Sequence, residues 1–208
     1  KWVDSKTLQF DLRKGVKFHN GEKFDADDVV FTLNYLGDPA NGAKPARNVN
    51  WWNNAEKLGE YKVQLNLKKE FPAALEFLSG PLVMYPNDYY SKNGPEGMAL
   101  KPVGTGPYQV TSVEPGKRYK FKKYDGYHAS SPKGKANIGN IVIRTIAESN
   151  TQLAELFSGG IDWIWKVKPD QAERIKSQGE FTVKNSSTMR IGYLNFDAIF
   201  LHEYKCHF

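Results

Sequence analysis

The sequence predicts a mixed α/β fold, because segments with the spacing of strands alternate along the chain with segments that have the spacing of helices. Residues 61–68 alternate polar and apolar side chains, which is typical of a half-buried strand. Residues 29–36 repeat apolar side chains at helical spacing. In the second half of the chain, strand-like and helix-like segments follow one another in turn, which favours an α/β layout.

Composition limits the class of protein. The chain has 208 residues, enough for one or two domains. Hydrophobic residues make up 40% and charged residues 25%, which argues against collagen, a coiled coil and wholesale disorder. No run approaches 18 uninterrupted apolar residues, so the sequence predicts no membrane-spanning helix. The single cysteine, Cys206, excludes an internal disulfide framework and a multi-cysteine zinc site.

The first elements follow in a clear order. Residues 7–13 alternate and predict a strand. Asn20-Gly21 predicts a tight turn, since both residues tolerate positive φ. Asp25 is expected to cap a helix over the apolar stripe of 29–36, and Gly37-Asp38-Pro39 is expected to end it.

Loops separate the next elements. Residues 38–54 contain several Pro, Gly and Asn residues and are expected to form a loop. The strand at 61–68 follows, and Pro72 is expected to begin a short helix that runs to Leu78. Residues 86–106, rich in Pro, Gly, Asn and Lys, predict a domain boundary or a long surface loop.

The second half begins with a β-hairpin pattern formed by residues 107–113 and 118–124. Residues 141–146 predict another strand. Ser149 or Asn150 is then expected to cap a helix whose apolar face is followed by two glycines.

Three further elements are expected after these glycines, Gly159 and Gly160: a strand at 161–165, a helix at 169–177 and a strand at 190–196. Period-two alternation in the first of these strands would place both of its indoles on one face. That face either belongs to the core or lines a cleft, where an indole supplies apolar surface and one donor.

No catalytic or metal-binding motif stands out. The histidines form no spaced metal pair, and their nearest grouping with a cysteine lies near the C-terminus, at His202, Cys206 and His207. Gly104-Thr105-Gly106-Pro107 lacks the lysine and the following helix of a phosphate loop. We therefore expect no enzyme activity, no metal and no cofactor. A hydrolase that uses His19 and the acidic helix start is the alternative.

Positive charge is concentrated in the second half. The net charge is +6; residues 1–100 hold 13 basic and 13 acidic side chains, and residues 101–208 hold 16 and 10. The excess includes a cluster between Lys117 and Lys123. Such a cluster can bind nucleic acid or an acidic surface, or it can be the solvated face of a strand, which the alternating run favours.

Several motifs together resemble family 5 of the extracellular solute-binding proteins, which serve bacterial ABC importers of peptides, nickel and oligosaccharides. Residues 10–21 read FDLRKGVKFHNG, and residues 24–29 read FDADDV. Residues 102–108 read PVGTGPY, and residues 158–162 read SGGID. The motifs occur in the family's order, and the resemblance covers about residues 6–197.

The resemblance implies a partial type II periplasmic-binding-protein fold. Residues 1–100 would form an accessory domain, and residues 101–197 would form part of the first ligand-binding lobe. Residues 198–208 depart from the family pattern, and no signal-peptide pattern opens the chain, so a fragment of a longer protein is expected.

The family's mechanism implies that two lobes close over a peptide or a similar small solute and that the closed form docks on the membrane permease. The expected location is the periplasm, or the cell exterior with a membrane anchor. Trp165, Tyr193 and Asn195 are the expected ligand-binding residues. Because this chain lacks the second lobe, we expect weak affinity or none. No nucleic-acid partner is expected, although a basic nucleic-acid-binding module remains an alternative.

Overall fold

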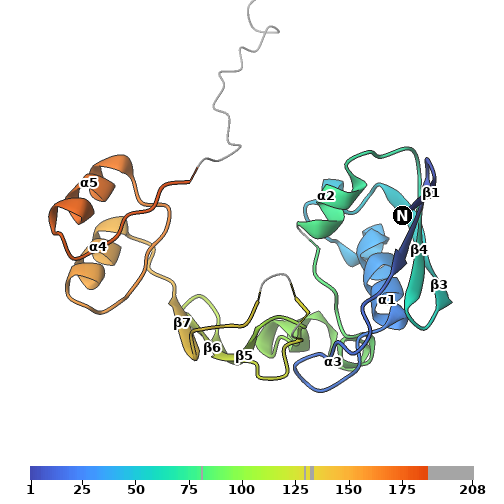
Figure 1. Ribbon diagram of the computed structural model, residues 1–208, viewed down its shortest axis with the longest axis horizontal. Helices are drawn as coiled ribbons and strands as arrows, with labels where there is room; N and C mark the ends of the chain where they lie inside the picture. The colour runs from blue at the N-terminus through green and yellow to red at the C-terminus, as the bar shows by residue number, and fades with distance from the viewer. Residues whose placement is uncertain (81, 129, 132–133, 187–208) are drawn as a thin grey trace, which may run out of the picture. The chain divides into compact units, whose positions relative to one another are not determined.

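The computed structural model describes residues 1–80, 82–128, 130–131 and 134–186 (Figure 1). The chain divides into two compact units after Ile146. Sheets and helices are both present, which confirms the predicted mixed α/β class. The predicted strand at 190–196 and the tail at 198–208 lie outside the described residues.

The first unit contains a four-stranded antiparallel sheet in the order β1-β2-β4-β3 (Figure 1). Alternate residues of β4 are buried, as the period-two pattern predicts. The predicted strand at 7–13 is confirmed, although it ends at Asp11. The strands are β1 (Trp2–Asp4), β2 (Thr7–Asp11), β3 (Trp52–Gly59) and β4 (Lys62–Leu67).

The segment expected to be a loop at 38–54 is only partly irregular. It contains two short 3₁₀ turns, Pro39–Asn41 and Ala46–Asn48, and then enters β3 at Trp52. The sequence of β3 lacks strict alternation and carries Asn53 and Asn54, so its strand character comes from pairing with β4 rather than from local pattern.

Helix α1 (Ala26–Gly37) lies against this sheet. Asp25 caps it as predicted, and its carboxylate accepts a hydrogen bond from the Asp27 N–H at 2.9 Å. Val29 and Leu33 are buried in the core formed with the sheet. The helix ends at the predicted position.

Residues 86–106 were expected to form a domain boundary or a long surface loop, and the loop alternative is wrong for most of the segment. Helix α3 (Asn87–Leu100) occupies it, although Gly94 has φ 66° and divides the helix in two. Tyr90 is buried beside the rings of Phe31 and Tyr35 on α1. Tertiary packing therefore overrides the local Pro and Gly signals.

Asp28 joins the starts of α1 and α3. Its carboxylate accepts a 2.9 Å hydrogen bond from the Asp25 N–H and a 2.8 Å hydrogen bond from the Asn87 N–H. Only 6% of the residue is exposed. Burial raises the pKa of Asp28, so dehydration of the carboxylate offsets part of the gain from these bonds.

The first unit also contains a three-stranded antiparallel sheet in the order β5-β6-β7 (Figure 1). The predicted hairpin and the following strand are confirmed. Gly116 has φ 73° in the turn between the first two strands, where a residue with a side chain would be strained. The strands are β5 (Tyr108–Glu114), β6 (Arg118–Lys123) and β7 (Asn140–Arg144). A short helix, α2 (Ala74–Ser79), lies between β4 and α3 in the sequence.

His19 fastens the Asn20-Gly21 turn to the loop that leads into β5. The Gly104 N–H donates to His19 Nδ1 at 3.3 Å, so the proton lies on Nε2, which donates to the Gly106 carbonyl oxygen at 2.9 Å. The imidazole also packs edge-on against Tyr124, with ring centroids 4.9 Å apart. The Tyr124 hydroxyl donates to the Phe18 carbonyl oxygen. We call these contacts the His19 clamp.

The second unit has a small core. Helices α4 (Ser149–Phe157) and α5 (Pro169–Ser177) pack around three buried side chains, Leu153, Leu156 and Ile175. Both helices were predicted. The predicted cap at Ser149 or Asn150 is wrong. The N-cap is Glu148, whose carboxylate accepts a hydrogen bond from the Thr151 N–H at 2.7 Å.

Asp28→Ala is expected to lower the free energy of unfolding by about 2 kcal/mol, because it leaves two N–H groups without their acceptor. The matched control is Asp27→Ala, which removes an exposed ion pair with Lys57 and is expected to cost less than about 1 kcal/mol. Urea unfolding of the chain measures both. Equal losses in the two variants would contradict the role given to Asp28.

His19→Ala is expected to lower the free energy of unfolding by about 2 to 3 kcal/mol, since it removes two hydrogen bonds and one ring contact. Hydrogen exchange of the Gly104 amide should accelerate in the same variant. His128→Ala, in a loop, is the control and is expected to cost less than about 1 kcal/mol. Unchanged exchange at Gly104 would show that the clamp does not form.

Candidate functional site

The segment between α4 and α5 carries the exposed aromatic residues of the second unit. It was predicted to include a strand at 161–165, and that prediction is wrong: no strand forms there. Ile161, Ile164 and Val167 pack against the small core, which gives an inward residue at every third position. This spacing does not match a strand, whose side chains alternate with period two.

Tight hydrogen bonds fix where this segment leaves α4. Gly159 has φ 75°, and its N–H donates to the Leu156 carbonyl oxygen at 3.2 Å. The Gly160 N–H donates to the Glu155 carbonyl oxygen at 2.7 Å. This is the pattern of a Schellman motif, so the two glycines end the helix as predicted.

Trp163 and Trp165 form a pair on the outside of the second unit. Their ring centroids lie 5.2 Å apart at an interplanar angle of 66°. Trp163 is 74% exposed and Trp165 is 53% exposed, so neither indole belongs to the core of this unit. The two indoles lie side by side, as predicted. They do so because they flank Ile164, whose side chain points inward, and not because the segment is a strand. Large aromatic side chains left open in this way are typical of contact sites.

Charged side chains flank the indole pair. Asp162 precedes it, and Lys166 and Lys168 follow it; all three are exposed. Lys166 has φ 60°, a conformation that costs energy in a residue with a side chain and that concentrates at binding sites. These two lysines are not among the ligand-binding residues predicted from the sequence. The one feature of the sequence that could have indicated them is their position just after the two tryptophans.

An ionised carboxylate lies at the start of α4 in the same unit. The backbone N–H groups of Asn150 and Thr151 hold the pKa of Glu148 below its usual range, and Lys168 adds a smaller effect in the same direction. The second unit therefore presents indole rings together with charges of both signs.

Of the three predicted ligand-binding residues, the structure places only Trp165. Tyr193 and Asn195 lie outside the described residues, so their assignment stays a prediction. Trp163 was absent from the predicted site although the alternation of the sequence already joined it to Trp165.

His19, the residue of the hydrolase alternative, is engaged at both ring nitrogens by the clamp described above. Its neighbours are backbone groups and a tyrosine ring, which is a structural arrangement. In the part of the chain that the structure describes, no three or more His, Cys, Asp or Glu side chains gather in a group that could hold a metal ion. Nor is any helix in that part long and apolar enough to cross a membrane.

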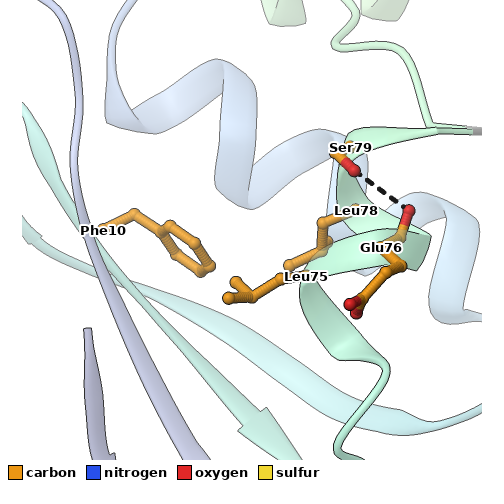
Figure 2. A pocket seen from close by; sticks show the side chains of 5 residues that line it. All are labelled: Phe10, Leu75, Glu76, Leu78 and Ser79. Carbon is orange, nitrogen blue, oxygen red and sulfur yellow. Dashed lines mark hydrogen bonds between the residues drawn. The ribbon is translucent and has the colours of Figure 1, made fainter.

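A shallow groove of about 430 Å³ lies in the first unit between β2 and α2 (Figure 2). Phe10, Leu75 and Leu78 supply its apolar lining. The Ser79 hydroxyl donates to the Glu76 carbonyl oxygen within the helix, so that donor is already used (Figure 2). The groove therefore offers apolar contact and one carboxylate, without convergent polar groups.

Comparison with known proteins identifies relatives across nearly the whole chain. A family model described as "Bacterial extracellular solute-binding proteins, family 5 Middle" matches residues 2–198. The glutathione-binding protein GsiB of Escherichia coli O1:K1 is 28% identical over 199 residues, which cover 94% of this chain and 38% of that protein. The dipeptide-binding protein of Escherichia coli K12 is 26% identical over 226 residues and is covered to 41% of its length.

Solved structures agree with this assignment. NikA from Brucella suis, crystallised with Fe(III)-EDTA, is 31% identical with a TM-score of 0.70, over 86% of this chain and 36% of that one. The described fold is thus part of the type II periplasmic-binding-protein fold, as predicted, and the chain spans well under half the length of these relatives. The match over residues 2–198 shows that the chain belongs to the family 5 bacterial extracellular solute-binding proteins.

Proposed function

We propose that this chain is part of the substrate-binding component of a bacterial ABC importer, which captures a peptide or a similar small solute and delivers it to the membrane permease. The observation that carries the proposal is the family match over residues 2–198. Neither the hydrolase nor the nucleic-acid alternative has support among these relatives. The proposed location is the periplasm or the outer face of the membrane.

The proposed solute contacts Trp165, with Trp163 beside it. The paired indoles offer a broad apolar surface and N–H donors to a peptide backbone or side chain. Lys166 and Lys168 are placed to attract a carboxylate, and Asp162 to attract an amine. A short peptide carries both groups, and two of the relatives are named for glutathione and for dipeptides. Tyr193 and Asn195 complete the proposed site.

Closure over the solute requires a second lobe, in the mechanism that the family resemblance implies. Contacts made from both lobes favour the closed state, and the permease recognises that state. This chain spans 38% of the length of GsiB. The residues proposed here contact the solute from one lobe only. The solute therefore meets part of its contacts here, and its affinity for the chain is low.

Titration of the chain with dipeptides and with glutathione, followed by NMR of the five indole N–H signals, tests this function. The signals of Trp163 and Trp165 are expected to shift with a dissociation constant of about 1 mM or weaker. The buried Trp51 and Trp52 are internal references that should not move. Trp165→Ala should abolish the saturable shift of Trp163.

The matched control is Trp2→Ala, which removes an exposed indole from the first unit and should leave the titration unchanged. Absence of any shift at Trp163 and Trp165 with all these solutes would contradict the proposed site. Nanomolar affinity of the chain would instead contradict the need for a second lobe.

A further inference from the structure

The β5-β6-β7 sheet has two chemically different faces. In β6, Arg118, Lys120 and Lys122 alternate with Tyr119 and Phe121, so the cations share one face and the rings share the other. These three cations are exposed, whereas the two rings and the last cation of the strand, Lys123, are half-buried. The central strand therefore presents a row of three positive charges to solvent.

Register extends this separation to the neighbouring strands. Tyr119 lies opposite Val113 and Ile143, and Phe121 lies opposite Val110 and Ile141. The second face is therefore mainly apolar, with one cation, Lys123, at its end. On the first face, Arg118 lies opposite Arg144 on β7 and Glu114 on β5. We call this first face the cationic face; with Lys117 from the turn it carries five cations, which are Lys117, Arg118, Lys120, Lys122 and Arg144.

One anion lies among these cations. Glu114 pairs with Arg118 at 2.6 Å, and this arginine, together with the more distant Lys120 and Lys117, holds the pKa of Glu114 below its usual range. The side chains of Lys120 and Lys122 make no hydrogen bond or ion pair within the described residues. Neither lysine is therefore neutralised by a directly paired carboxylate, and the face keeps a net positive charge.

The geometry of the face fits a flat anionic surface. Side chains on one face of a strand project in the same general direction at intervals of about 7 Å, so the row from Arg118 to Lys122 spans roughly 14 Å. Ser112 and Val142 flank Lys120, and Asn140 lies beside Lys122. These neighbours supply no aromatic ring, whereas proteins that bind single-stranded nucleic acid stack bases on such rings.

We infer that the cationic face of the β5-β6-β7 sheet adsorbs to the surface of a membrane that contains anionic phospholipids. The positive charges attract the phosphate-bearing headgroups without insertion, because the face carries only one exposed apolar side chain, Val142. Adsorption is independent of the ligand site proposed above, which lies in the other unit. It would hold a solute-binding protein near the membrane in which its permease resides.

Co-sedimentation of the full chain with lipid vesicles tests the inference. The chain should bind phosphatidylcholine vesicles that contain phosphatidylglycerol and should not bind phosphatidylcholine alone. Raising NaCl from about 0.1 M to about 1 M shortens the Debye length from about 10 Å to about 3 Å and should release the protein. Each cation near an anionic surface strengthens adsorption about five-fold, so Lys120→Gln/Lys122→Gln should weaken it about 25-fold.

The matched control is Lys69→Gln/Lys92→Gln, which changes the net charge equally at two exposed lysines elsewhere in the first unit. It should bind vesicles like the unmodified chain. Three results would overturn the inference: no binding to phosphatidylglycerol vesicles, equal weakening by the two double variants, or tighter binding to duplex DNA or to polyglutamate than to vesicles at the same salt. Dipeptide binding and vesicle binding are measured separately. A chain that does not bind dipeptides can still bind vesicles, so the two experiments distinguish failure of the proposed function from failure of this inference.

Discussion

The contact between α1 and the edge strand β3 is the constraint on which the first unit depends. The buried Trp52 indole N–H donates to the Leu33 carbonyl oxygen at 3.0 Å, and the Asn34 side chain bonds to both the N–H and the carbonyl oxygen of Ala55. The two Asn34 bonds satisfy backbone groups at the open edge of β3, and the indole bond ties the same strand to a carbonyl of α1. They also require Gly37, where a Cβ atom would lie 2.5 Å from the Trp52 indole nitrogen.

Within the described residues, polar side chains of the motifs that resemble the family pattern hold separate parts of the fold together. His19, from the motif at residues 10–21, forms hydrogen bonds with Gly104 and Gly106 of the motif at residues 102–108. Asp28, from the helix start, holds the first turn of α3. Because polar side chains here bond to backbone groups far away in the sequence, the motifs fix how loops meet. The chemistry proposed for ligand recognition lies elsewhere, on the loop between α4 and α5.

The loop between α4 and α5 shows how a small core can hold large aromatic side chains at the surface. Three inward apolar residues at every third position anchor it, while both indoles remain open to solvent. The β5-β6-β7 sheet separates its faces by period two instead, with rings on one side and cations on the other. In both places, the residues that do not pack inward are the ones available for partners.

The sequence by itself determined most elements, because period-two alternation, the Asp25 cap and the glycine stops act locally. It also determined the family, because the motifs lie in the chain in a fixed order. Tertiary structure alone decided that α3 forms despite Gly94 and Pro95, since Tyr90 packs on α1. It likewise decided that residues 161–165 do not form a strand, since a strand needs a partner for its backbone and this segment instead packs two apolar side chains, Ile161 and Ile164, against two helices.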